Sequence, residues 1–115
     1  MKKLDTMVCV TFQRVGYHNY PDAPEAVDYL KSTHRHLFKF KVCLEVFSAD
    51  REVEFHLLLR WLEENIEKTL NLDYQSCEML ADCLADLMSS KYAGRKLSIE
   101  VWEDGECGSI STYEL

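Results

Sequence analysis

The chain has 115 residues, 47% of them hydrophobic and 29% charged, which describes one globular domain over residues 1–115 with no room for a second core. Its 13 basic and 20 acidic residues give a formal net charge of −7, which argues against binding to the phosphate backbone of nucleic acid. The longest apolar runs, such as residues 57–59, are far shorter than a membrane span. We therefore expect no nucleic-acid and no membrane partner.

The N-terminal residues and the cysteine pattern bear on the cellular compartment in which the protein is expected. Residues 1–5 lead into a strand-like stretch without the apolar central region and cleavage site of a secretory signal. The cysteines are odd in number and contain no C-x-x-C pair, so they predict neither a disulfide framework nor a thiolate zinc site. They are Cys9, Cys43, Cys77, Cys83 and Cys107. We expect free thiols and a cytoplasmic protein.

Two strands are expected in the N-terminal half. Residues 4–14 alternate between two faces, one of them largely apolar, which predicts a first strand. Glycine, asparagine and two prolines make residues 16–24 a loop, and residues 24–30 have room for one or two helical turns. Residues 34–47 form the second strand and a turn follows at 49–52. The two strands are expected to pair antiparallel through their long connection.

The hydrophobic period lengthens at Val53, which predicts two helices. Apolar side chains over residues 55–70 share one helical face and charged side chains occupy the other, until residues 71–73 break the pattern. Ser76 is a suitable N-cap for the second helix. That helix is expected to end near Gly94, which can adopt the left-handed conformation of a helix C-cap.

The C-terminal residues predict a hairpin. Residues 97–103 alternate as a third strand, residues 104–106 turn the chain, and residues 108–113 form a fourth strand. The expected order is ββααββ, an α+β fold with a four-stranded antiparallel sheet and both helices on one face. Such a sheet has two exposed edge strands, which self-association would cover.

Three histidines are the candidate metal ligands. His34 and His36 open the second strand, and because strand side chains repeat with a period of two, both rings leave the same face about 6.6 Å apart along the chain. His18 follows the first strand and would approach them if the two strands pair antiparallel. Three imidazoles with a fourth position open are a typical catalytic zinc site. The alternative is that His34 and His36 only form hydrogen bonds and His18 is a surface residue.

Several short motifs, taken in their order along the chain, make the sequence resemble the family of 6-pyruvoyl-tetrahydropterin synthase and 6-carboxy-tetrahydropterin synthase. The family has a histidine after strand one, H-x-H opening strand two, V-[DE]-F entering the first helix, a hydroxyl residue and glutamate opening the second, and V-x-E-[DT] closing strand three. The resemblance extends from about Val10 to Tyr113. The matching residues are His18, His34-Arg35-His36, Val53-Glu54-Phe55, Ser76-Cys77-Glu78 and Val101-Trp102-Glu103-Asp104.

The resemblance implies a tunnelling fold that assembles through its sheet edges into trimers stacked as a hexamer, with sites at subunit interfaces. It implies Zn²⁺ held by His18, His34 and His36. It also implies that Glu103 anchors the N–H edge of a pterin or similar heterocycle, and that Ser76 and Cys77 line the same pocket.

The chain departs from the family at its proton-transfer groups. The family's cysteine a few residues before H-x-H is missing from residues 28–33, and its leucine-aspartate-histidine motif reads Leu72-Asp73-Tyr74 here. General acid/base groups contribute about 10²- to 10⁴-fold each, so losing both should suppress the usual synthase reaction. Asp28, Asp73 and Cys77 are the candidate replacements. Cys77 could instead be an inert buried cysteine.

These features leave three hypotheses open. The first is a zinc-dependent lyase or related enzyme that acts on a reduced pterin or deazaguanine precursor with altered proton-transfer groups. The second is a non-catalytic, zinc-containing protein on the same fold that binds a pterin-like or purine-like ligand or regulates another protein. The third is a structural oligomer whose histidines only pack.

Overall fold

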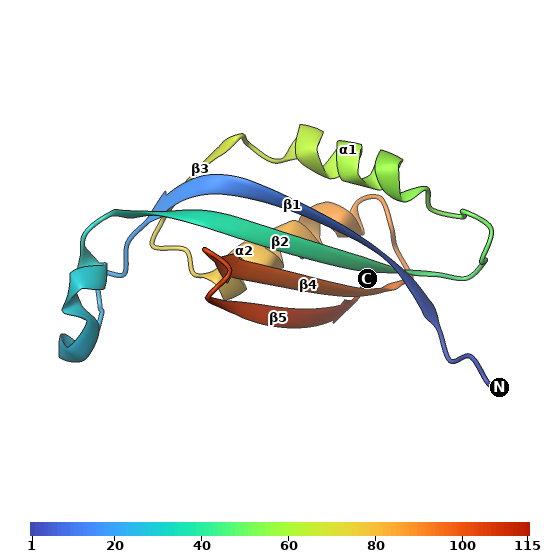
Figure 1. Ribbon diagram of the computed structural model, residues 1–115, viewed down its shortest axis with the longest axis horizontal. Helices are drawn as coiled ribbons and strands as arrows, with labels where there is room; N and C mark the ends of the chain where they lie inside the picture. The colour runs from blue at the N-terminus through green and yellow to red at the C-terminus, as the bar shows by residue number, and fades with distance from the viewer.

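A computed structural model describes all residues 1–115, and its core element is a curved sheet that carries two α-helices (Figure 1). The α+β class is confirmed. The elements in chain order are β1 (Thr6–His18), the 3₁₀ helix η1 (Glu25–Lys31), β2 (His34–Val46), α1 (Phe55–Asn65), β3 (Thr69–Asp73), α2 (Cys77–Ser89), β4 (Lys96–Glu103) and β5 (Cys107–Glu114).

The sheet has five strands in the order β3-β1-β2-β4-β5, so the prediction of a four-stranded antiparallel sheet is wrong. The first helix ends at Asn65, and Thr69–Asp73 forms a strand that pairs parallel with residues 15–18 of β1. Leu70 and Leu72 are buried on alternate positions of this strand. The four-residue spacing from Ile66 to Leu70 fits a helix as well, which is why sequence periodicity extended the helix too far.

The long antiparallel pairing of β1 with β2 is confirmed, from Thr6 opposite Val46 to His18 opposite His34. β1 is longer than predicted, so His18 is the last residue of the strand and does not lie in the following loop. A strand end fixes a side chain more firmly than a loop does. This register positions the histidines.

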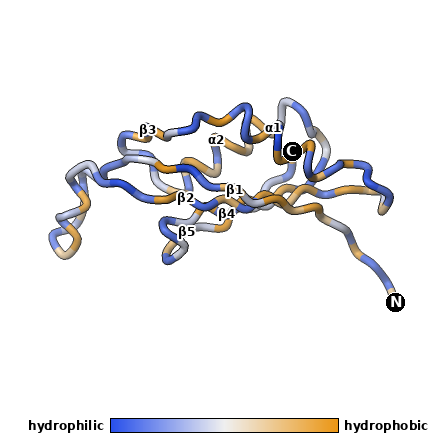
Figure 2. Tube along the Cα trace, turned by 45° about the horizontal axis from the view of Figure 1, so that its top comes forward, coloured by the Kyte–Doolittle hydropathy of each residue, from blue (hydrophilic) through white to orange (hydrophobic).

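The hydrophobic core lies between the helices and the even-numbered side of β1 and β2. Hydrophobic and hydrophilic residues alternate along the central strands (Figure 2), as expected for a sheet with one covered face. Side chains from both α-helices and from β1, β2, β3 and β4 join one buried cluster, and Tyr113 of β5 packs against it. Phe38, Leu58, Leu62 and Met88 of this cluster are at most 1% exposed.

Each α-helix begins at a capping side chain. The Glu54 carboxylate accepts a hydrogen bond from the backbone N–H of Leu57, and the Ser76 hydroxyl accepts one from the N–H of Met79, as the sequence predicted for Ser76. The Ser76 cap sets where α2 starts and thereby places Cys77 against the end of β4. No helix combines the length and apolar character that a bilayer crossing requires.

Candidate metal centre

The three predicted histidines meet at one end of the sheet. His18 ends β1, His34 opens β2 directly opposite, and His36 lies two residues further along the same face. One ring nitrogen from each residue lies within 4.8 Å of the other two. The rings stand edge to face, with centroids 4.6, 4.9 and 5.1 Å apart. The three side chains could together hold a metal ion.

Phe38 forms the floor beneath the histidines. Its ring meets His18 and His36 edge-on, with centroid distances of 5.3 and 5.7 Å. Gly16 makes this packing possible, because a Cβ at that position would lie 2.7 Å from Cε2 of Phe38. A side chain at residue 16 would therefore displace the ring that supports the site.

Each histidine is oriented through its Nδ1 atom. Nδ1 of His18 donates to the carbonyl of Gln75 at 2.9 Å, and Nδ1 of His34 donates to the carbonyl of Ser32 at 2.7 Å. Nδ1 of His36 donates to Oδ2 of Asp104 at 2.7 Å. A carbonyl or carboxylate oxygen only accepts, so the proton is on Nδ1 and, in the neutral ring, Nε2 keeps its lone pair. A histidine that binds a metal through one ring nitrogen usually donates its other ring N–H to a carbonyl or carboxylate in the same way.

The His36 ring supplies the test of whether the site fits a cation. Its Nε2 atom is buried and has no hydrogen-bond partner, although it lies 3.0 Å from Oε2 of Glu103. A buried polar atom without a partner is costly, and a lone pair that faces a carboxylate is repelled by it. A cation between the rings removes both penalties, so the residues fit a metal bound by imidazole.

Asp104 contacts the histidine cluster, although the sequence pattern indicated no role for it beyond its place in the V-x-E-[DT] motif. Its carboxylate accepts from the backbone N–H of Leu37 at 2.8 Å as well as from His36, and these two bonds lower its pKa, the Leu37 bond most. The residue has a positive φ of 56° and begins the β4–β5 turn with Gly105. One feature of the sequence could have indicated this role. Asp104 directly follows Glu103 at the end of the strand that pairs with β2, and it lies beside Leu37 near the start of β2.

A cavity of about 380 Å³ opens beside His18 and His34, and Ser76, Cys77 and Glu103 are among the residues that line it. Sγ of Cys77 donates to Oε1 of Glu103 at 3.6 Å. Burial, followed by the charge of Glu103, raises the pKa of the Cys77 thiol to about 12. This environment favours an inert thiol over a reactive one.

The other two candidate replacements for the proton-transfer groups lie outside this cavity. Asp28 is exposed on η1 and Asp73 is exposed at the end of β3, and neither lines the cavity. The backbone carbonyl of Asp73 accepts from the N–H of Asn19 at 2.7 Å, which ties the loop after β1 to the end of β3. Tyr20 and Tyr74 do line the cavity, one from each of these two segments.

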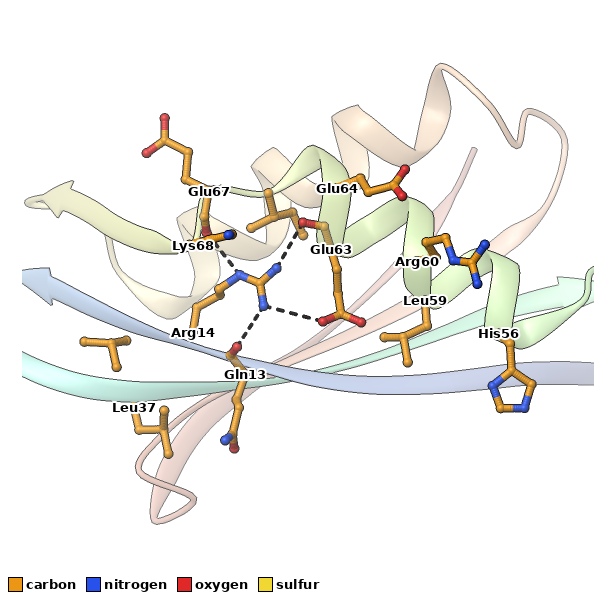
Figure 3. A pocket seen from close by; sticks show the side chains of 12 residues that line it. Gln13, Arg14, Leu37, His56, Leu59, Arg60, Glu63, Glu64, Glu67 and Lys68 are labelled. Atoms are coloured by element: carbon orange, nitrogen blue, oxygen red, sulfur yellow. Dashed lines mark hydrogen bonds and ion pairs between the residues drawn. The ribbon is translucent and has the colours of Figure 1, made fainter.

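A larger and more open groove of about 980 Å³ runs between β1 and α1, away from the histidine triad (Figure 3). Arg14 lies at its centre and donates to the carbonyls of Gln13, Glu63 and Glu67 at 3.0, 3.1 and 3.1 Å. His56 is exposed at the far end of the groove. Arg14 thus fastens the C-terminal end of α1 to the sheet, and its donors are used within the chain.

The fold and the site define an α+β protein with a candidate centre of three histidines. No protein-family model matches the sequence, and no curated protein matches it.

Proposed function

We propose that this protein is a zinc-dependent member of the 6-pyruvoyl/6-carboxy-tetrahydropterin synthase family, a lyase or related enzyme for a reduced pterin or deazaguanine precursor. One observation carries the proposal. Three imidazoles, each with Nδ1 already paired, converge beside a cavity whose wall presents the Glu103 carboxylate. The combination of a metal centre with an acceptor for N–H groups is what this chemistry requires.

Zinc is the proposed ion because imidazole nitrogen is one of its usual ligands and because three protein ligands leave a fourth position open. When bound, it would act as a Lewis acid that polarises a substrate oxygen. The chain holds His18, His34 and His36 in place for it through Gln75, Ser32 and Asp104. The triad is thereby oriented before any ion arrives.

The rest of the cavity suits a small planar heterocycle. Its volume of about 380 Å³ lies in the range of small-molecule sites. The Glu103 carboxylate can accept two hydrogen bonds from the N–H edge of a pterin or purine. Ser76 and Cys77 lie at the start of α2 beside it, where Ser76 Oγ is engaged as the helix cap and Cys77 is buried. They would shape the pocket while Glu103 anchors the ring.

The alternative is a zinc-containing protein that binds a pterin-like or purine-like ligand without turnover, or that regulates another protein. The Cys77 environment favours it, because a thiol with a pKa of about 12 is a poor proton donor or acceptor at neutral pH. Asp28 and Asp73 would have to move into the cavity to take over that role. The two proposals therefore differ in whether another group replaces the family's proton-transfer residues.

We also propose that the chain forms a homo-oligomer, as a trimer or hexamer. β3 covers only residues 15–18 of β1, so the preceding part of β1 has no strand beside it on that side. β5 is the opposite edge of the sheet and exposes Ile110 by 63%. Unpaired edges of this kind are suited to pairing between subunits. The assembly can be measured by light scattering during gel filtration.

The test combines metal analysis with turnover. Purified protein is expected to contain one zinc per chain and to convert dihydroneopterin triphosphate, followed by absorbance and by chromatography of the products. The His56→Ala variant should retain both properties, since His56 lies outside the triad. Saturable binding of the compound without conversion would favour the binding protein. Protein that neither holds zinc nor binds a pterin would contradict both functions.

A further inference from the structure

Glu103 ends β4 on the same sheet face as the histidines, and its two oxygens point in different directions. Oε2 lies 3.0 Å from Nε2 of His36, and Oε1 lies 3.8 Å from Nε2 of His18. Ligand atoms at about 2.0–2.1 Å from one tetrahedral zinc ion are about 3.3–3.4 Å apart. The two distances lie on either side of this spacing and involve different oxygens, so a small movement of the Glu103 side chain would bring one oxygen to an ion shared with the histidines.

The carboxylate also lacks the backbone donors that some other acidic side chains of this protein have. Glu52, Glu54 and Asp104 each accept at least one backbone N–H. Glu103 accepts only from the Cys77 thiol at 3.6 Å, and a thiol is a weak donor. Its side chain is 29% exposed, and the atom nearest to its Oε2 on the histidine side is Nε2 of His36. A cation between these two atoms would be attracted to both.

Hydrogen bonds and strand pairing hold the backbone at Glu103 in place, so its side chain starts from a defined position. The N–H of Asp104 donates to the carbonyl of Leu37 at 2.8 Å, and the Asp104 carboxylate accepts from the N–H of the same residue at 2.8 Å. Glu103 is also paired with Phe38 across the sheet. Strand β2 thus positions both the two histidines and the residue that faces them.

We propose that Glu103 is a fourth ligand of the metal in the ligand-free protein, so that the resting centre has three imidazoles and one carboxylate. The inference rests on the proposed metal centre but not on the proposed substrate. It gives Glu103 two exclusive partners, the ion when the cavity is empty and the N–H edge of a heterocycle when it is filled. A ligand that engages Glu103 would leave His18, His34 and His36 as the residues that hold the ion.

The competing arrangement has no metal. In it, His36 carries a positive charge and pairs with Glu103 and Asp104 at once, which would explain the 3.0 and 2.7 Å distances equally well. The two arrangements differ in whether the Glu103 carboxylate contributes to the affinity for a metal. Substitution by glutamine separates them, because the amide keeps the shape of the side chain and removes its charge.

The experiment uses the full chain with Zn²⁺ for affinity and Co²⁺ for the visible spectrum, which reports the ligands and the geometry of the ion. In Glu103→Gln, we expect zinc affinity to fall at least about 10-fold and the cobalt spectrum to change, because water would replace the carboxylate. Glu100→Gln is the matched control, because it removes the same charge from the same strand on the other sheet face. It should change neither property. Circular dichroism of the metal-free variants confirms that each is folded.

The outcomes are distinct. A Glu103→Gln variant with the zinc affinity and cobalt spectrum of the parent would overturn the fourth ligand while leaving the three-histidine centre and the proposed function intact. A parent protein that binds neither metal would overturn both proposals, and would support the charged His36 instead. A changed spectrum with weakened affinity supports the ligand whether or not any pterin binds.

Discussion

β1 carries two polar clusters that differ in how their groups are satisfied. Around Arg14, the guanidinium donates to three backbone carbonyls and faces the Glu63 carboxylate at 3.9 Å. Around His18, Nε2 of His36 has no hydrogen-bond partner, and the Glu103 carboxylate accepts only from the Cys77 thiol, which is a weak donor. The Arg14 groove has a larger volume than the cavity beside His18, but the histidine cluster contains the buried Nε2 of His36, which lacks a partner. Missing partners are the better indication of a ligand site.

The largest expected effect comes from removing a ligand of the histidine cluster. His36→Ala should lower zinc affinity by at least about 100-fold, because the ion loses one of its imidazoles and the Asp104 carboxylate loses its link to the site. Competition with a chromophoric chelator measures the affinity. His56→Ala is the control, since that ring is exposed on α1. Equal affinities in the two variants would mean that the triad does not bind the metal.

Asp104→Asn should have a smaller effect of the same kind. The amide is uncharged and holds the His36 ring less firmly, and outer-shell partners of this type contribute about 10- to 100-fold to affinity. Glu106→Gln, two residues further along the same turn, is a charge-matched control that should leave affinity unchanged. An Asp104→Asn protein with parental affinity would show that the ring is oriented by packing against Phe38 and not by this hydrogen bond.

Arg14→Ala should change stability and leave the metal centre unaffected. Three carbonyls lose a charged donor from a side chain that is 11% exposed, so we expect the free energy of unfolding to fall by about 1–3 kcal/mol. Urea unfolding measures this change. Lys68→Ala in the same groove should stay within about 0.5 kcal/mol, because Lys68 is exposed. A loss of zinc affinity in Arg14→Ala would show that the two clusters are coupled.

The two clusters also differ in how far sequence could predict them. The period of two in residues 34–47 and the H-x-H motif placed His34 and His36 on one face, and antiparallel pairing brought His18 near. The carbonyls of Ser32 and Gln75 that orient the rings belong to the backbone, which has no sequence signature. The Arg14 cluster escaped notice because its partners depend on α1 ending at Asn65. The helix was instead expected to continue to Leu70, into the first residues of β3.

The smallest expected effect concerns the Cys77 thiol at the edge of the histidine cluster. Its pKa of about 12 means that the thiolate, which is the reactive form, is a minor species until the pH approaches that value. With iodoacetamide at pH 8, Cys77 should remain unmodified while the exposed Cys107 reacts, as peptide mass mapping would show. Glu103→Gln should speed the labelling of Cys77, because the neighbouring negative charge is one cause of the raised pKa. Burial is the larger cause, so the variant's Cys77 should still react more slowly than Cys107. Rapid labelling of Cys77 in the parent protein would restore it as a candidate for proton transfer.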